Sequence, residues 1–416
     1  MFNSQLLSEI RDRFHHVDHC PYQGPRIFFE NAGGSLTLKS VVEVSTHFSS
    51  IPDNQGRDNP ASRELVRIIN KARDDMKLFF GVSDGVVFTG ESGTELLFRL
   101  VRAAVMGSAA GGNVVGSTLE HPATASARNQ WCPVAGKQNI NIAHDKDRAI
   151  VTPEHYLAHV TPDTRAATII QTSPVTGMAV DVKGVAEAIR SISPDCFIVV
   201  DSIQHAAHGV IDIGATGVDG CALSGYKVFS RHNYGVAWVS PRMSTLLHEK
   251  LDGTADNFWE LGTRDTGAFA TFSTVVEYLE WLGSQVSDAS DRRARLEAAG
   301  RAMAEQEAHL VDVAINGSDG RKGIRDLPGA FIVGGADNPY REGLVSYAFD
   351  HIPSVDVVAA LNERGIRTHL RKADYFSASV LDPINLDSCI RTSFCHYNSK
   401  DEILALLDAL AEITQK

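Results

Sequence analysis

Apolar residues follow two alternating patterns along the first two thirds of the chain. Short uninterrupted apolar runs, such as residues 86–89 and 197–200, alternate with longer segments in which apolar residues recur every three to four positions, such as 62–80 and 96–105. The short runs predict strands that are buried on both faces, and the longer period predicts amphipathic helices. Strands that alternate with helices favour an α/β fold around a mostly parallel sheet.

The last third of the chain has a different order of predicted elements. We expect strands at 344–349, 366–369 and 390–394, with a helix at 355–364. A capping box, Ser399-x-x-Glu402, opens a final amphipathic helix. This order predicts a smaller α+β domain.

A polar stretch, residues 284–290, marks the expected hinge between two domains. We therefore predict a large domain over residues 31–284 and a small C-terminal domain over 291–416. Residues 1–30 are expected to form an N-terminal segment that packs with the small domain.

Composition narrows the class of protein without indicating an activity. Hydrophobic residues make up 43% and charged residues 22% of the 416 positions, as in ordinary globular proteins. The net charge of -12 and the lack of a basic run argue against nucleic acid and anionic membranes as partners. The chain start lacks a leader pattern, so a cytoplasmic protein is expected. The six cysteines are scattered, and no set of spacings predicts a metal site.

The stretch from residue 197 to residue 227 carries the most specific chemistry. The apolar run 197–200 ends in Asp201, with Gln204 three residues later. A second short strand then leads into Ser224-Gly225-Tyr226-Lys227. A carboxylate and a lysine at neighbouring strand ends are what a pyridoxal phosphate site needs, because the lysine forms the Schiff base and the carboxylate keeps the pyridine nitrogen protonated.

These motifs resemble those of the class V aminotransferase family, which includes the cysteine desulfurases. The resemblance implies a fold-type I pyridoxal phosphate enzyme, with a mixed, mostly parallel seven-stranded sheet and a smaller α+β domain. It also implies that Asp201 pairs with the pyridine nitrogen and Gln204 bonds the ring hydroxyl. Ser224 would contact the phosphate, and Lys227 would hold pyridoxal 5'-phosphate covalently. Tyr226 stands where the family usually has histidine.

Two further segments agree with this resemblance on the cofactor side. The turn Gly90-Glu91-Ser92-Gly93-Thr94 leads from a strand into a helix, which is a ready site for an anion. The family implies that Gly93 and Thr94 bind the phosphate. His121 follows the strand 113–116, and the family implies that its imidazole stacks on the pyridine ring and moves protons.

The resemblance also implies a dimer and a substrate side. In the family, the threonine of Trp-Glu-x-Gly-Thr, which is Thr263 in this chain, reaches the phosphate in the neighbouring subunit. This implies a homodimer with shared active sites. Asn31, Ala32 and Gly33 would line the substrate side of the cofactor. Pro174 replaces an asparagine that touches the ring hydroxyl, so that contact must be lost or replaced.

Arginines are the candidates for substrate recognition. Arg391 lies within an apolar strand, and a guanidinium binds a carboxylate in a bidentate manner. The family implies that Arg391 binds the substrate α-carboxylate. The preceding segment, 368–377, is expected to be a loop, and its Arg371 could hold a second substrate carboxylate. The desulfurases carry a nucleophilic cysteine on this loop, whereas this chain has none there.

The sequence thus predicts an enzyme that acts on an α-amino acid, with pyridoxal phosphate as cofactor. Transamination, in which a keto acid is the co-substrate, is narrowly favoured. An α,β-elimination lyase remains the alternative, and a non-catalytic binding protein on the same fold is a remote one. The identity of the amino acid is left open.

Overall fold

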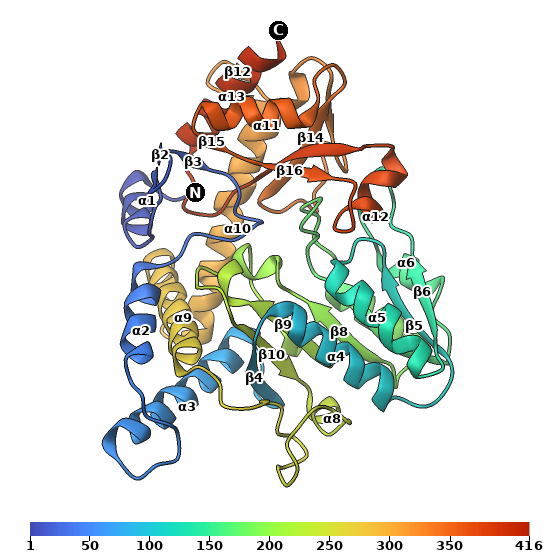
Figure 1. Cartoon of the computed structure of the whole chain (residues 1–416). Helices are drawn as coiled ribbons and strands as arrows, with labels where there is room; N and C mark the ends of the chain where they lie inside the picture. Colours follow the sequence, from blue (N-terminus) through green and yellow to red (C-terminus); the bar gives the residue numbers. More distant parts are fainter. Residues whose placement is uncertain (416) are drawn as a thin grey trace.

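A seven-stranded sheet is the central element of the computed structural model, which describes residues 1–415 (Figure 1). In sheet order its strands are β4 (Val86–Gly90), β10 (Gly235–Val239), β9 (Gly220–Ser224), β8 (Phe197–Asp201), β7 (Thr164–Ile170), β5 (Asn113–Ser117) and β6 (Gln138–Ile142). Strand β10 is antiparallel to both of its neighbours, and the other neighbouring pairs run parallel. The predicted mixed, mostly parallel sheet is confirmed.

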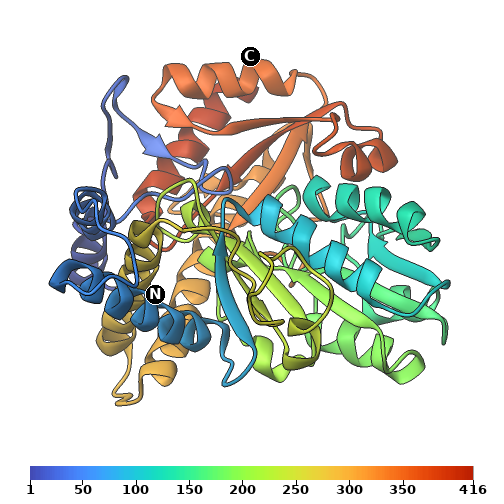
Figure 2. The same cartoon turned by 60° about the horizontal axis from the view of Figure 1, so that its bottom comes forward.

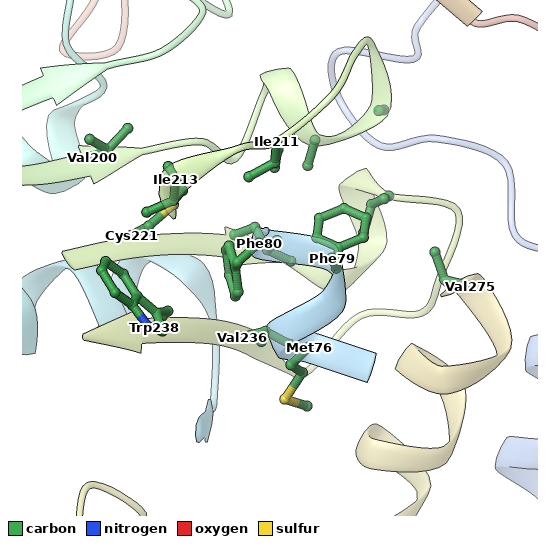
Figure 3. Packing of buried hydrophobic residues seen from close by; sticks show 14 of the residues in the cluster. Met76, Phe79, Phe80, Val200, Ile211, Ile213, Cys221, Val236, Trp238 and Val275 are labelled. Carbon is green, nitrogen blue, oxygen red and sulfur yellow. The ribbon is translucent and has the colours of Figure 1, made fainter. Parts of the chain in front are cut away.

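The sheet is buried on both faces, as the uninterrupted apolar runs predict. Along β10, Val236 and Trp238 belong to one hydrophobic core, whereas Ala237 and Val239 belong to another. Helices α3 (Pro60–Phe80), α7 (Val182–Ile192) and α9 (Thr266–Val286) pack in the first core, part of which Figure 3 shows. Helices α4 (Gly93–Gly107) and α5 (Pro122–Val134) cover the other face.

Four antiparallel strands form a second, smaller sheet near the C-terminal end of the chain (Figure 2). Their order is β13 (Ala330–Ile332), β14 (Leu344–Phe349), β17 (Ser388–Ser393) and β16 (His369–Lys372). This sheet packs in its own core with α11 (Ser354–Glu363) and α13 (Lys400–Thr414). The capping box at Ser399 and Glu402 is present at the start of α13.

The predicted strand 366–369 is wrong. Residues in this range belong to two strands of different sheets, β15 (Ile366–Arg367) and β16. Strand β15 pairs in parallel with β3 (Ile27–Phe28), whereas β16 joins the small sheet. One apolar pattern cannot indicate this change of partner, because both strands have the same local character.

Helix α10 (Arg292–Asn316) links the two hydrophobic cores. Leu296 and Met303 pack in the first core, and Leu310 packs in the core of the small sheet. The guanidinium of Arg292 also lies 2.8 Å from the carboxylate of Asp75 on α3. The division at residues 284–291 therefore stays a prediction, since α9 reaches Val286 and α10 contacts both parts.

The remaining elements are short or peripheral. They are α1 (Ser4–Arg11), β1 (His19–Cys20), β2 (Gly24–Pro25), α2 (Lys39–Ser49), α6 (Pro153–Leu157), α8 (Pro241–Ser244), β11 (Gly317–Ser318), β12 (Arg321–Lys322) and α12 (Ala378–Leu381). Among the residues that the structure describes, no helix has both the length and the hydropathy of a membrane span.

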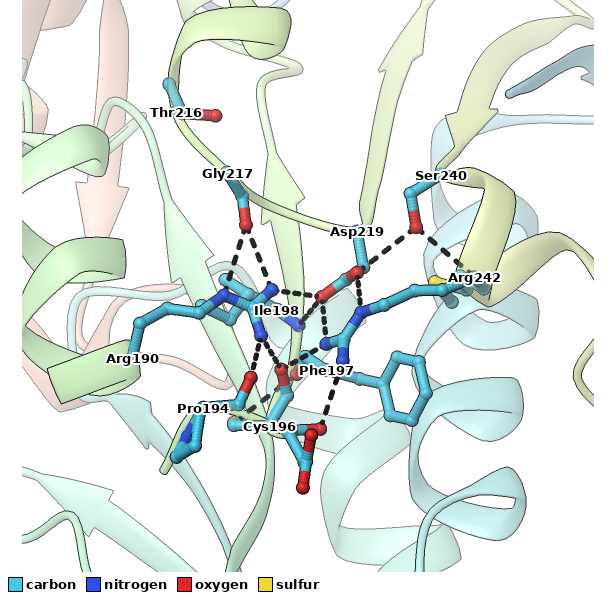
Figure 4. A network of polar contacts seen from close by, with 12 residues as sticks. Arg190, Pro194, Cys196, Phe197, Ile198, Thr216, Gly217, Asp219, Ser240 and Arg242 are labelled. Atoms are coloured by element: carbon cyan, nitrogen blue, oxygen red, sulfur yellow. Dashed lines mark hydrogen bonds and ion pairs between the residues drawn. The ribbon is translucent and has the colours of Figure 1, made fainter. Parts of the chain in front are cut away.

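A buried ionic network fixes the starts of β8 and β9 (Figure 4). The carboxylate of Asp219 accepts hydrogen bonds from the backbone N–H of Ile198 at 2.9 Å and from Arg242 Nε at 2.6 Å. Arg190 Nη2 donates to the same carboxylate at 2.8 Å. Both arginines also donate to the carbonyl of Cys196. The network holds the two strands together at the end of the sheet opposite their carboxyl ends.

Candidate active site

A cavity lies at the carboxyl ends of β8 and β9, where open α/β sheets bind their ligands. Its lining residues are Thr94, His121, Ile170, Thr172, Pro174, Asp201, Ile203, Gln204, Ser224, Tyr226 and Lys227. The fold therefore brings together six of the residues that the sequence analysis singled out: Thr94, His121, Asp201, Gln204, Ser224 and Lys227. Their roles remain predictions, but their proximity is a property of the structure.

Lys227 follows β9 in a short 3-10 turn (Gly225–Lys227) and extends into the cavity. Its Nζ donates a hydrogen bond to the carbonyl of Ala32. Burial, followed by the positive charges of Arg391 and Arg371, lowers the pKa of Lys227 to about 7. A large share of the side chain is thus a neutral amine at neutral pH, which is the form that attacks a carbonyl carbon.

Asp201 ends β8 and is almost fully buried, with 3% of its surface exposed. Its Oδ1 accepts a hydrogen bond from the backbone N–H of Ile203 at 3.0 Å. Burial raises the pKa of this carboxyl to about 7, although the bond from Ile203 opposes the rise. A cationic group placed against the carboxylate would offset that cost.

Two further buried residues, His208 and Glu307, orient the side chain of Gln204. Its Nε2 lies 2.8 Å from His208 Nε2, and His208 Nδ1 lies 2.7 Å from Glu307 Oε2. Burial disfavours the charged form of His208, but the Glu307 carboxylate beside it raises the pKa of the imidazole above its usual value. With its Nδ1 donating to Glu307, His208 can accept from the Gln204 NH₂ through Nε2, and the amide oxygen is left as the free end of Gln204.

His121 is a neutral imidazole at the start of α5. Its Nδ1 accepts a hydrogen bond from the backbone N–H of Ala123 at 3.1 Å, so the ring proton is on Nε2. Burial, followed by the charges of Lys227 and Arg371, lowers the pKa of His121 to about 4.

The start of α4 forms part of the cavity wall, which Thr94 lines. The backbone N–H of Gly93 donates to Ser224 Oγ at 3.2 Å. A Cβ at position 93 would lie 2.4 Å from that oxygen and 2.5 Å from the side chain of Ile203, so a larger residue would displace both side chains. The first N–H groups of a helix lack intrahelical partners and attract anions.

These features fit pyridoxal phosphate. Gln204 Oε1 is buried without a hydrogen-bond partner among the described residues, so this amide has unused capacity beside the cavity. Thr94 and Ser224 line the cavity and offer hydrogen-bond donors to an anion of the size of phosphate, and Asp201 offers a buried carboxylate to a protonated ring nitrogen.

The residues predicted for the substrate side, Asn31 to Gly33, have different contacts in the structure. Both ends of the Asn31 amide are engaged by the protein, because Nδ2 donates to the Ser393 carbonyl at 2.7 Å and Oδ1 accepts from Tyr397. Asn31 therefore fixes the segment that carries the Ala32 carbonyl. A Cβ at Gly33 would lie 3.1 Å from the Glu30 carbonyl, which is a tight but not prohibitive contact.

Arg391 lies on β17, and only 1% of its surface is exposed. Its Nη1 donates to the carbonyl of Pro174 at 2.9 Å, which directs the side chain to the cavity wall. Burial, then the charge of Arg371, lowers the pKa of Arg391 to about 9, which leaves the guanidinium charged at neutral pH. Pro174, which departs from the family pattern, thus supplies a backbone acceptor for this arginine.

One expectation about secondary structure near the site is wrong in part. The first half of the predicted loop 368–377 contains the strand β16, so His369, Arg371 and Lys372 lie on a regular strand rather than on a flexible segment. The segment 368–377 reads as a loop because its charged residues mask the β pattern. All six cysteines are buried, and none lines the cavity.

Thr263 does not line this cavity. It lies beside a separate hollow with Phe48, Asn54 and Arg264. The predicted role of Thr263 in a neighbouring subunit concerns a second chain, so it stays a prediction.

The sequence analysis missed several residues of the site. Thr172 lines the cavity, and its Oγ1 donates to Glu342 at 2.7 Å. His208 and Glu307 support Gln204, and Cys395 Sγ lies within 4.8 Å of both of their ligand atoms. His208 follows Gln204 by one helical turn, which is a usable signal. Glu307 is 99 positions away from His208, and no local pattern connects them.

The large mixed sheet and the small antiparallel sheet, with a lysine and a buried aspartate lining one cavity, match the fold of the fold-type I pyridoxal phosphate enzymes. The chain belongs to the aminotransferase class-V family, whose sequence model matches residues 27–406. Members of this family depend on pyridoxal phosphate. The predicted family and fold class are confirmed.

Relatives with curated descriptions are distant but span most of the chain. The cysteine desulfurase-like protein UstD of Aspergillus flavus is 26% identical over 415 aligned residues, which cover 94% of this chain and 88% of the relative. The aminotransferase-like protein FGM3 of Gibberella zeae is 23% identical, with 92% and 94% covered. A cysteine desulfurase from Thermococcus onnurineus NA1 has a similar fold, with a TM-score of 0.81, 18% identity and 98% of each chain covered.

Proposed function

We propose that this protein is a pyridoxal phosphate-dependent enzyme that converts an α-amino acid, with transamination as its reaction. The observation that carries the proposal is the pair formed by Lys227 and Asp201 across one cavity. The pKa of the lysine is lowered to about 7 and that of the aspartate is raised to about 7, both by burial. Groups whose environments shift their pKa values in this way are typical of catalytic sites.

When bound, pyridoxal phosphate supplies an aldehyde that condenses with amines and a ring that accepts electrons from the substrate Cα. The Asp201 carboxylate would hold the ring nitrogen in its protonated form. Gln204, oriented by His208, would hydrogen-bond the ring hydroxyl, and Gly93 with Thr94 and Ser224 would hold the phosphate.

Lys227 Nζ is the group of this chain best suited to move a proton. Its pKa of about 7 lets the amine accept a proton and return it at neutral pH. The Ala32 carbonyl accepts a hydrogen bond from Nζ, so it fixes the direction of the side chain. Arg391 would bind the α-carboxylate and thereby orient the amino acid. His121, neutral and carrying its proton on Nε2, would close the other side of the site.

The direct test of the cofactor is spectroscopic. The purified protein should absorb in the visible range, and borohydride should bleach this band and fix the cofactor to Lys227, as peptide mass analysis would show. A Lys227→Ala variant should lack the fixed adduct. A colourless protein that does not take up added pyridoxal phosphate would contradict the proposal and leave a binding protein on the same fold.

An α,β-elimination lyase is the second candidate, and the names of several relatives favour it. Several relatives are named cysteine desulfurases, and this name describes a reaction on the sulfur-bearing side chain of cysteine. No cysteine lines the cavity among the described residues, so we do not propose a persulfide mechanism. Elimination needs a leaving group on the β carbon but no protein thiol.

One product assay separates the two reactions. Each amino acid of a panel is incubated with the enzyme, with and without an added keto acid. Transamination predicts a new amino acid that forms only when the keto acid is present. Elimination predicts ammonia and a keto acid without any co-substrate.

We also propose a homodimer with shared sites. The proposal rests on the family motif at Trp259-Glu260-Leu261-Gly262-Thr263 and on the position of Thr263 outside the cavity of its own chain.

A further inference from the structure

The small sheet turns several basic side chains toward the cavity. His369 lies directly opposite Arg391 in the pairing of β16 with β17, and Arg371 lies opposite Cys389. Opposite residues share a face of the sheet, and alternate residues along a strand share it too. Arg371, His369 and Arg391 therefore point to the same face, which is the face where Arg391 contacts the cavity wall at Pro174.

The positive charge of Arg371 reaches the centre of the site. It lowers the pKa of Lys227, of His121 and of Arg391. The two arginines lie at diagonal positions of the β16–β17 pair, for which Cβ atoms are about 7–8 Å apart or somewhat less. The charge of Arg371 lowers the pKa of Arg391, so the two guanidiniums repel each other unless an anion lies between or beside them.

The side chain of Arg371 has no hydrogen bond or ion pair with any other residue in the described part of the chain. Its Nε is buried and unpartnered, and burial lowers the pKa of the side chain. Two carboxylates are near enough to affect it, Glu30 and Asp374. Glu30 Oε1 is bound to His369 Nδ1 at 3.0 Å, and Asp374 Oδ1 accepts the backbone N–H of Phe376 at 2.9 Å.

A second arginine follows the same pattern. Arg391 Nε is also buried without a partner, and Nη1 is occupied only by a neutral carbonyl. A buried guanidinium is costly unless a charged partner compensates it, and carboxylates are its preferred partners. One amino acid with a single carboxylate would satisfy only one of the two arginines.

We propose that Arg371 binds an acidic group on the substrate side chain, so that the enzyme takes a dicarboxylic amino acid such as aspartate or glutamate. This inference rests on the proposed function, because it assigns the second binding group of the same site. In this arrangement Arg391 binds the α-carboxylate and Arg371 binds the carboxylate at the far end of the substrate. The pair selects both for the amino acid and for the charge of its side chain.

The test compares acids with their amides, which have nearly the same shape. The holoenzyme is titrated with L-aspartate, L-asparagine, L-glutamate and L-glutamine, and dissociation constants are measured by calorimetry and by the change in cofactor absorbance. For the wild type we expect at least one acid to bind about tenfold or more tightly than its amide, the usual discrimination from one charged pair.

Arg371→Met should remove most of this preference while it changes the dissociation constants of the amides by no more than about threefold, since those ligands do not use the charge. Arg371→Lys should retain a reduced preference, because it keeps the charge without the planar fork. Lys372→Met is the matched control: Lys372 is the next residue on β16, faces the other side of the sheet and is exposed. This control should keep the full preference.

Two kinds of failure are distinguishable. If all four amino acids shift the cofactor absorbance but acids and amides bind equally, the inference about Arg371 is wrong and the proposed function stands. The same holds if Arg371→Met and Arg371→Lys both keep the wild-type preference. If none of the four changes the absorbance of a cofactor-loaded wild type but another amino acid does, the inference is wrong and the proposed function stands; if no amino acid changes it, the proposed function fails as well.

Discussion

Burial is the main cause of the pKa shifts at the candidate active site. It lowers the pKa of Lys227 and His121 and raises the pKa of Asp201, in each case ahead of any individual charge. A buried group favours its neutral form, and it regains charge when a charged ligand arrives. The protein without a ligand therefore carries an electrostatic cost that a cationic ring nitrogen and an anionic substrate would relieve.

This cost predicts that Asp201→Asn stabilises the cofactor-free protein at about pH 8. The folded-state pKa of Asp201 is about 7, so the folded protein holds a proton that the unfolded chain releases near pH 4. The free energy of unfolding of the wild type should therefore fall as the pH rises from about 4 to about 7, by up to about 1.4 kcal/mol per pH unit, and change no further above that range. The variant lacks this titration.

Urea unfolding of both cofactor-free proteins at several pH values measures the difference. The advantage of the variant should grow between about pH 4 and pH 7 and then stay constant. The same variant should bind pyridoxal phosphate more weakly, since the ring nitrogen loses its charged partner. A stability difference that is independent of pH would contradict the raised pKa.

Glu307 and His208 illustrate how residues outside the cavity determine what its lining can do. Glu307→Gln should weaken cofactor binding by roughly 1–2 kcal/mol, because His208 would lose the carboxylate that accepts from its Nδ1, and the Gln204 amide would lose its fixed orientation. The wavelength of maximum cofactor absorbance should also shift, since the hydrogen bond of Gln204 to the ring hydroxyl changes. Titration of the cofactor-free protein with pyridoxal phosphate measures both.

Glu305→Gln is the control for this prediction. Glu305 is on the same helix, α10, and its side chain is exposed. An identical loss of affinity in both variants would mean that Glu307 acts through the stability of α10 rather than through His208.

At the scale of elements, the two ends of β8 and β9 carry residues with different roles. The carboxyl ends of β8 and β9 carry Asp201 and Ser224, and their starts are joined by the network around Asp219. A strand that is fixed at one end can present a strained or costly residue at the other, because the sheet does not shift to relieve it.

Asp219→Ala should therefore cost about 1–3 kcal/mol of unfolding free energy, since it leaves the buried N–H of Ile198 without its acceptor and two partly exposed guanidiniums without their carboxylate. Chemical denaturation measures this loss. The folded fraction should bind the cofactor as the wild type does, because the network lies at the opposite end of the sheet. Asp195→Ala, which removes an exposed carboxylate nearby, should change stability by no more than about 0.5 kcal/mol.

At the scale of the whole molecule, the proposed dimer makes a prediction about hybrid proteins. If Thr263 serves the partner's site, a dimer of one Lys227→Ala chain and one Thr263→Ala chain contains one site with neither substitution. That hybrid should bind one cofactor per dimer with wild-type affinity. The Thr263→Ala homodimer should bind it more weakly at both sites.

Light scattering gives the mass of the wild type, and differently tagged chains allow the hybrid to be purified. A monomer with full activity would contradict the shared-site dimer. A hybrid whose remaining site has the affinity of the Thr263→Ala homodimer would show that Thr263 acts on its own chain.

The sequence by itself determined the local structure and the chemistry that lies close together along the chain. Apolar runs without interruption predicted the strands that lie between the two cores, because a strand covered on both faces has no polar side. Asp201, Gln204, Ser224 and Lys227 were predictable because parallel strands place their carboxyl ends at one edge. The capping box at Ser399 and Glu402 is a contact between neighbours and needs no other element.

Only the tertiary structure decided which distant residues meet. The contact of Arg391 with the Pro174 carbonyl joins positions 217 residues apart, and the strand register places Arg371 on the same face as Arg391. The pairing of β15 with β3 and of β16 with β17 also joins segments that no local pattern connects. Periodicity shows that a segment is a strand or a helix, but partner and register depend on side chains packed from elsewhere in the chain, and these carry no signal in the local sequence.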